Sequence, residues 1–429
     1  MLKERMVNHQ LPKGWQAKPL VQLCTLFTDG DWIESKDQSL DGIRLIQTGN
    51  VGCGEFKDRR DKARWISQET FEKLKCEEVF PDDCLISRLP DPVGRSCLIP
   101  ETGDKMITSV DCSIIRLNRS FIIADFFNYY TQSAKYLEEV ESKCSGATRK
   151  RISRKNLGEV EILLPPLPEQ KRIVAILDEA FANISQTVAN AEKNLANARE
   201  LFDSYLNEVF THKGEGWEEK YLSDGELLKI IDGDRGSNYP TASEFFPEEY
   251  CLFLSTKNVR PDGFKFNETM FITKEKDQAL RKGKLQRLDV VLTTRGTIGN
   301  VAIYDEKVDF ENIRINSGML IFRPNQSLIL SEYLFEVLRS NFIKKQINAS
   351  VSGAAQPQLP IKTINNFKIP VHPSIEKQKF ISNKIKKLSC ECEELEDIYR
   401  RKLAALAELK QALLQKAFTG ELTAADQPT

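Results

Sequence analysis

The sequence contains no long apolar run and no excess of charge of either sign. Nothing in its 429 residues approaches the roughly 18 consecutive apolar residues of a transmembrane helix, and Met1 to Trp15 lack the apolar core of a signal peptide. Sixty-one lysines and arginines balance 62 aspartates and glutamates, so no global positive field favours nucleic acid. We therefore expect a cytoplasmic protein that would hold any nucleic-acid partner through local patches of charge.

Histidine is scarce, and the cysteines lack the spacing of a metal site or of a disulfide framework. Three histidines accompany ten cysteines, and there is no C-x-x-C pair. The closest pair, Cys390 and Cys392, falls in a strongly helical stretch, where residues two apart face different sides. Reduced and partly buried thiols are therefore the favoured interpretation for a cytosolic chain of this size.

Catalytic signatures are missing as well. The sequence has no G-x-x-x-x-G-K-[ST] phosphate loop, no G-x-G-x-x-G after a strand, no G-x-S-x-G elbow, no H-E-x-x-H zinc motif and no asparagine-proline-proline-aromatic motif of an amino-methyltransferase. A calcium loop starting at Asp232 fails because its twelfth position is Ser243 instead of glutamate. A nuclease-like pattern can be assembled from Asp262 and residues 305–307 only with unrestricted spacing, and such a pattern is expected by chance. These absences favour a binding protein over an enzyme.

What the sequence does contain is an internal repeat of about 205 residues, and an ordered series of matches supports it. Gln170 matches Gln378 and Phe210 matches Phe418 at the same separation, so no gap falls between them. The other matches pair Trp15 with Trp217, Asp29 to Asp31 with Asp232 to Asp234, Leu45 to Val51 with Phe253 to Val259, Asp83 to Arg88 with Asp289 to Arg295, and Ser145 to Ala147 with Ser352 to Ala354. The two halves of the chain are therefore copies of one plan.

The first part of each copy, residues 12–164 and 214–370, mixes short β-rich runs with turns marked by glycine and proline. Apolar residues at helical spacing over 123–137 and 330–338 predict one helix in each part, with its aromatics in the core. The expected strands are Ile43 to Val51, Asp83 to Arg88, Ser113 to Leu117, Cys251 to Val259, Val290 to Thr294 and Met319 to Phe322. Both parts are predicted to be globular α+β domains.

A long charged stretch without proline follows each domain, from about Pro168 to Thr211 and from Pro373 to Thr419. Apolar residues in both stretches step by three and four, which is the seam of a two-stranded coiled coil, and Lys402 is the only polar interruption. The predicted seams are Ile184, Val188, Ala191, Leu195, Ala198, Phe202, Tyr205 and Val209, and Ile385, Leu388, Cys392, Leu395, Tyr399, Leu406, Leu409 and Leu413. Two such helices most simply pair with each other, although each could pack on its own domain instead.

Candidate DNA contacts gather at loop ends. Arg149, Lys150, Arg151, Arg154 and Lys155 place five positive charges in seven residues, a run that binds phosphate if it is ordered near a duplex and is otherwise a solvated loop. The equivalent place in the second copy holds Gln356 and Gln358, and glutamine pairs with adenine as arginine does with guanine. Arg88 and Arg295 are expected at matching strand ends, with Thr294 and Thr297 beside Arg295, as base or phosphate contacts or as surface ion pairs.

These features are similar to those of a known family. The run Leu164 to Val174 (LPPLPEQKRIV), its echo Ile375 to Ile381, and Leu414 to Leu422 (LQKAFTGEL) resemble the specificity subunit of Type I restriction-modification systems. The resemblance covers nearly the whole chain in the order domain, helix, domain, helix. It implies target recognition domains over 1–164 and 214–370, a central helix over 165–213, and a distal helix and tail over 371–429.

The resemblance also implies a non-catalytic subunit with defined partners. Each recognition domain would read one half of an asymmetric bipartite site in double-stranded DNA, and two long antiparallel helices would separate the domains, set the unread gap and dock two methyltransferase subunits. S-adenosylmethionine would be bound by the methyltransferase, and ATP and Mg would be bound by partner subunits, among them the restriction subunits. No cofactor is therefore expected on this chain. A coiled-coil scaffold, a stand-alone DNA-binding protein, and a single-chain nuclease or methyltransferase remain alternatives.

Overall fold

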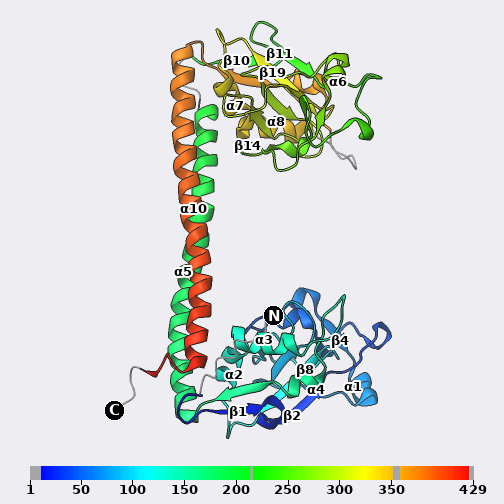
Figure 1. Cartoon of the computed structure of the whole chain (residues 1–429), viewed down its shortest axis with the longest axis vertical. Coiled ribbons are helices and arrows are strands. Elements are labelled where there is room, and N and C mark those ends of the chain that lie inside the picture. Colours follow the sequence, from blue (N-terminus) through cyan, green and yellow to red (C-terminus); the bar gives the residue numbers. More distant parts are fainter. Residues whose placement is uncertain (1–10, 213–215, 351–357, 425–429) are drawn as a thin grey trace. The chain divides into compact units, whose positions relative to one another are not determined.

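The computed structural model describes residues 11–212, 216–350 and 358–424 (Figure 1). The chain forms two compact units. The first unit holds residues 1–191 and 401–429, and the second holds residues 192–400. Within the described ranges, none of the helices is long and apolar enough to cross a membrane.

The globular part of the first unit contains three small sheets. A four-stranded antiparallel sheet has the order β2-β8-β5-β6, a three-stranded sheet has the order β4-β3-β7 with β3 and β7 parallel, and β1 pairs with β9. Its strands are β1 (Gln16–Pro19), β2 (Cys24–Asp29), β3 (Ile43–Ile46), β4 (Arg64–Ile66), β5 (Cys84–Ser87), β6 (Ser96–Leu98), β7 (Met106–Thr108), β8 (Cys112–Leu117) and β9 (Glu161–Leu164). Strands β3 and β5 are buried on both faces, which explains why the sequence shows apolar runs there instead of alternation.

Four short helices complete this globular part: α1 (Gln68–Leu74), α2 (Ala124–Tyr130), α3 (Ala134–Ser142) and α4 (Arg154–Gly158). The single helix expected over 123–137 is therefore wrong, because Ser133 caps a new helix there by accepting a hydrogen bond from the Tyr136 amide. The aromatics Phe126, Phe127 and Tyr130 are fully buried, as predicted for core residues.

The second unit repeats this topology strand for strand. Its sheets have the orders β11-β19-β16-β17 and β15-β12-β18, with β12 and β18 parallel, and β10 pairs with β20. It adds a small hairpin, β13-β14. The strands are β10 (Glu218–Tyr221), β11 (Leu228–Asp232), β12 (Cys251–Leu254), β13 (Val259–Arg260), β14 (Gly263–Phe264), β15 (Phe271–Ile272), β16 (Val290–Thr293), β17 (Val301–Ile303), β18 (Ile313–Ile315), β19 (Met319–Pro324) and β20 (Lys368–Val371). Its short helices are α6 (Lys274–Ala279), α7 (Ser331–Arg339), α8 (Asn341–Ser350) and α9 (Ile361–Ile364).

The helices α5 (Leu167–Thr211) and α10 (Ile375–Thr419) are 45 residues long each and pack against one another (Figure 1). In the first unit the Lys410 ammonium lies 5.0 Å from the ring centre of Phe181, and in the second the Lys384 ammonium lies 5.5 Å from that of Tyr205. Early residues of one helix thus meet late residues of the other, which confirms the predicted antiparallel pair.

The seam of α5 is as predicted, and the predicted seam of α10 is buried or half-buried except at Leu395 and Leu409. The predicted members Leu395 and Leu409 are 39% and 47% exposed, whereas Glu396 is 17% exposed. Glu396 turns inward because it forms ion pairs with Arg199 across the helix pair and with Arg400 on its own helix. At these two turns the next residue along the helix, Glu396 or Lys410, contacts α5 in place of the predicted leucine.

One glutamine fastens each long helix to a globular part. Gln170 is fully buried: its Oε1 accepts a hydrogen bond from the Ile123 amide at 2.9 Å, and its Nε2 donates to the carbonyls of Phe121 and Pro165. Gln378 repeats this set with Leu330, Leu328 and His372. The repeat therefore preserves a buried polar junction. In both glutamines the side-chain oxygen and nitrogen are hydrogen-bonded to backbone groups.

The two globular cores also include the ends of the long helices. Phe418, near the end of α10, packs edge-on against Tyr130 in the first unit, with ring centres 5.0 Å apart. Phe210, near the end of α5, makes the matching contact with Tyr333 in the second unit at 5.7 Å. All ten cysteines are free thiols, and six of them are buried, as the reduced interpretation requires.

Candidate nucleic-acid interface

In both units a polar edge forms where the third strand of the larger sheet ends. After β5, the Arg88 amide donates a hydrogen bond to the Asp111 carbonyl at 2.9 Å; after β16, the Thr294 amide donates to the Gly318 carbonyl at 2.8 Å. Matching backbone contacts thus make Thr294, and not Arg295, the equivalent of Arg88. The match expected between Arg88 and Arg295 is one residue out of register.

A shift of one residue reverses the face on which a side chain lies. Arg88 is 5% exposed and Thr294 is 4% exposed, whereas Arg295 is half-buried at the surface. The Arg88 guanidinium donates to the Val110 carbonyl, and its Nε lies 3.4 Å from Asp29 Oδ1. Burial lowers the pKa of Arg88, and Asp29 opposes that shift. Arg88 thus lies beneath the edge, between the turn at Val110 and the end of β2 at Asp29.

The basic run of the first unit is ordered and exposed. Residues 145 and 151 form a bridge that closes the loop, and Gly146 adopts a φ of 105° close to the Arg149 carbonyl, where a side chain would clash. Lys150 pairs with Glu141 of α3, and Arg151 lies 3.0 Å from Asp111. Arg149, Arg154 and Lys155 are exposed, and Arg154 begins α4.

The second unit presents different chemistry on the same backbone frame. Arg295 and Gln358 face each other in an antiparallel bridge, so two of the predicted contact residues lie together. Thr297 is exposed and its carbonyl accepts the Thr293 hydroxyl. Gln356 lies outside the described residues. The structure thus pairs the backbones of an arginine and a glutamine at the surface.

Two acidic residues of the first edge escaped sequence reasoning. Asp111 holds Arg151, and Asp29 lies against Arg88. In the second unit the position of Asp111 is Gly318, where an added Cβ would lie 3.1 Å from Thr256 Cγ2 and 3.5 Å from Arg295 Cβ. The repeat of Asp29-Gly-Asp31 as Asp232-Gly-Asp234 was the one sequence signal near these acids.

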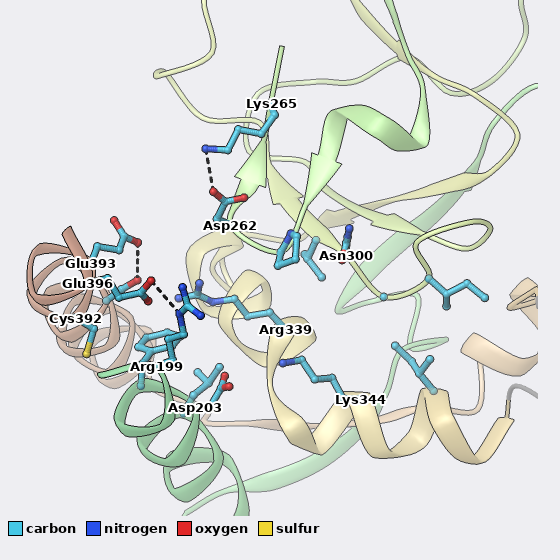
Figure 2. Close-up of a pocket in the computed structure, with 18 of the residues that line it drawn as sticks. Arg199, Asp203, Asp262, Lys265, Asn300, Arg339, Lys344, Cys392, Glu393 and Glu396 are labelled. Carbon is cyan, nitrogen blue, oxygen red and sulfur yellow. Dashed lines mark hydrogen bonds and ion pairs between the residues drawn. The ribbon is translucent and has the colours of Figure 1, made fainter. Parts of the chain in front are cut away.

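A separate cleft of about 880 Å³ opens inside the second unit, between its globular part and the segments of α5 and α10 that belong to this unit (Figure 2). Figure 2 shows Arg339 and Lys344 extending from α7 and α8 toward Arg199 of α5. Glu396 of α10 lies 3.1 Å from Arg199, and the Arg339 guanidinium lies 4.8 Å from the ring centre of Phe202.

The lining of this cleft carries as many acids as cations. Its cations are Arg199, Lys265, Arg339, Lys344 and Arg400, and its acids are Asp203, Asp262, Glu393, Glu396 and Asp397. Lys265 pairs with Asp262 at 2.9 Å, so part of the charge is already neutralised. Such a balance provides no excess positive charge for phosphate. Among the described residues, moreover, no three histidine, cysteine or acidic side chains are placed to hold a metal ion.

The fold and the edges define a class: a protein with two copies of one α+β recognition domain, each with its own polar edge, and a paired helix attached to both. Comparisons with known proteins identify the class further. The family model of the Type I restriction modification DNA specificity domain matches residues 12–194 and 215–402. The chain therefore belongs to that family, and it is a DNA specificity subunit, a non-catalytic component of a Type I restriction-modification system.

Two relatives and two solved structures are similar to this chain over most of their length. The chain is 24% identical to the Escherichia coli Type I restriction enzyme EcoBI specificity subunit, over 90% of this chain and 86% of that protein. It is 22% identical to the EcoKI specificity subunit of Escherichia coli K12, over 97% and 90%. A chain from a structural study of assembly and conformational transition in a type I restriction-modification system has a TM-score of 0.78 at 20% identity, covering 96% of this chain and 100% of that one. The HsdS subunit of Thermoanaerobacter tengcongensis has a TM-score of 0.59 at 20% identity, over 97% and 99%.

Proposed function

We propose that each unit reads one half of a bipartite site in double-stranded DNA through the polar edge described above. The observation that carries this proposal is that one backbone frame bears Arg151 with Asp111 in the first unit and Arg295 with Gln358 in the second. Arginine forks fit guanine and glutamine amides fit adenine in the major groove. Equal frames with unlike side chains are what independent reading of two different half-sites requires.

The remaining basic residues of the first unit would hold the phosphate backbone. Arg149, Lys150, Arg154 and Lys155 are exposed, and Lys150 would exchange its partner Glu141 for a phosphate. Such contacts fix register and carry no sequence information. Arg88 would support the edge from below, Thr294 would do the same in the second unit, and Thr297 would extend the second edge. Gln356 stays a predicted DNA contact.

The helix pair would dock two methyltransferase subunits on repeated surfaces. Leu201 of α5 and Leu409 of α10 occupy equivalent positions in the repeat, and they are 53% and 47% exposed. Exposed leucines at matching places on both helices are the kind of apolar patch that a partner covers. Restriction subunits would join this assembly, with S-adenosylmethionine, ATP and Mg bound by the partner subunits and the whole complex acting on DNA in the cytoplasm.

Co-expression with a methyltransferase subunit tests both parts. We expect native mass spectrometry to find two methyltransferase copies per chain, and Leu201→Asp and Leu409→Asp to remove one copy each. We also expect gel shifts of the complex to show preference for a duplex that carries the methylated site over a scrambled duplex. Assembly without any DNA preference would instead support a scaffold, and DNA preference of the chain alone would support a stand-alone binder.

A further inference from the structure

A tight turn borders the polar edge in both units and is built in the same way. It comprises Asp29-Gly30-Asp31 at the end of β2 and Asp232-Gly233-Asp234 at the end of β11. A Cβ at Gly30 would come within 2.4 Å of the Ser109 carbonyl, and one at Gly233 within 2.2 Å of the Asn316 carbonyl. Both turns therefore lie flush against the neighbouring strand, and only glycine allows that approach.

Hydrogen bonds lock the second aspartate of each turn. The Asp31 amide donates to the Thr108 carbonyl at 2.8 Å, its carbonyl accepts from the Val110 amide at 2.9 Å, and its carboxylate accepts from the Glu77 amide at 3.2 Å. The Asp234 carboxylate accepts from the amides of Gly236 and Arg281, both at 2.7 Å. The residue that follows each turn is thus projected from a rigid base.

That residue is Trp32 in the first unit and Arg235 in the second. Trp32 is 71% exposed. The Arg235 side chain is 51% exposed, and its Nη2 lies 3.3 Å from both Asp232 Oδ1 and the Ser317 carbonyl. Asp232 orients the Arg235 side chain, and about half of Arg235 and most of Trp32 stay open to solvent.

Backbone contacts place both side chains beside the proposed reading residues. The carbonyl of Asp31, which precedes Trp32, is bound by the amide of Val110, and the next residue, Asp111, holds Arg151. In the second unit Arg235 bonds Ser317, and the next residue, Gly318, lies against Arg295. Trp32 and Arg235 therefore lie close in the fold to Asp111 and Gly318, which border the proposed reading residues.

We propose that Trp32 and Arg235 are specificity-determining residues: Trp32 packs on the methyl group of a thymine in the first half-site, and Arg235 donates its fork to a guanine in the second. Tryptophan and arginine are the residues that most often carry binding energy at interfaces. A large exposed ring gains by covering an apolar group, and the thymine methyl is the apolar group of the major groove. The cations of Arg151 and Arg154 near this edge favour duplex DNA as the partner over a protein surface. The inference rests on the proposed DNA-reading function and adds two contacts to it.

The test uses the complete methyltransferase complex and duplexes in which each base pair of the mapped site is replaced in turn. We expect Trp32→Ala to lose about tenfold of discrimination at one base pair of the first half-site only, and Trp32→Phe to keep most of it. Arg235→Ala should lose a similar factor at one base pair of the second half-site only, with Arg235→Lys unable to restore it because lysine has no fork. Each variant controls for the other, and Leu40→Ala, a change of a 98% exposed side chain in the same loop as Trp32, should change neither half.

Replacing single thymines by deoxyuridine removes only the methyl group. One such replacement in the first half-site should weaken binding by the wild-type complex, and the same replacement should have no further effect on Trp32→Ala. The difference in fluorescence between wild type and Trp32→Phe isolates the emission of Trp32. Acrylamide should quench this emission less when the specific duplex is added.

Normal reading of the wild-type site with no change in Trp32→Ala at any base pair would overturn the inference and leave the DNA-reading function intact. Loss of methyltransferase docking in Trp32→Ala would overturn it as well, because Trp32 would then be a protein contact. Failure of the wild-type complex to prefer any site would overturn the proposed function itself.

Discussion

The two units share backbone contacts at their polar edges and differ there in side-chain chemistry. The edges after β5 and β16 make the same hydrogen bonds, yet one carries Arg151 with Asp111 and the other carries Arg295 with Gln358. The two halves of the helix pair differ in a similar way. Arg199 and Glu396 pair in the second unit, whereas the equivalent positions in the first are Ala407 and Val188. The repeat thus fixes where side chains stand and leaves their chemistry free to diverge.

Among the changes that test how the two units differ, exchange of a whole globular part should have the largest effect. We expect replacement of residues 14–164 by the corresponding domain of a relative to give the first half-site an entirely new sequence and leave the second unchanged, because the two edges share no residue. Mapping of methylated adenines in a host that expresses the chimaera measures this. Changes in both halves would show that the units do not read independently.

Lengthening the helix pair should change the gap between the half-sites. Four helix-forming residues after Ala191 and four after Tyr399 add about 6 Å to each helix. The matched insertion should lengthen the recognised gap by one or two base pairs with both half-sites retained, although the stutter locally unwinds the supercoil and costs some activity.

The control is an insertion in α5 alone, which leaves the two helices unmatched and should abolish methylation. A matched insertion that methylates at the original spacing would show that the helices do not set the gap.

Single substitutions should separate reading residues from holding residues. Arg295→Ala or Gln358→Ala should cost about 1 to 3 kcal/mol of discrimination at one base pair if the side chain reads a base edge. Lys150→Ala should weaken binding to every duplex alike and lower the slope of binding against salt by about one. Competition gel shifts over a salt series measure both. If Arg295→Ala weakened binding to every duplex alike, Arg295 would be a phosphate contact and not a base contact.

The smallest effect is expected within the helix pair. The double variant Arg199→Ala with Glu396→Val gives the second unit the residues of the first. Because Arg199 is 56% exposed, the coupling energy between the two residues should lie below about 1 kcal/mol in a double-mutant cycle. Denaturant unfolding of the four chains measures that coupling, and a value several times larger would show that the polar pair is a main support of the second unit.

Much of the fold followed from local patterns in the sequence. The expected strand over Met319 to Phe322 is part of β19, and the expected helix over 330–338 is α7, because buried apolar runs and helical spacing are strong local signals. The gap-free pairs Gln170 with Gln378 and Phe210 with Phe418 marked real equivalences, since each pair has the same surroundings in both units.

The candidate site was only partly accessible in this way. The sequence named Arg295 and Gln358 separately, and their antiparallel bridge joins residues far apart in the chain. Trp32 carried no signal at all, because its exposure depends on a turn that packs against another strand.

The sequence by itself determined the two-fold repeat, the alternation of domains with long helices and the membership of the family, because these rest on residue order and periodicity. Only the tertiary structure decided which residues of a strand end face outward and where single turns of α10 depart from the predicted seam. A shift of one residue turns Arg88 inward while Arg295 stays at the surface, and one ion pair turns Glu396 inward in place of Leu395. Both outcomes depend on contacts with residues that are distant in sequence. A local pattern along the chain does not show which residues those are.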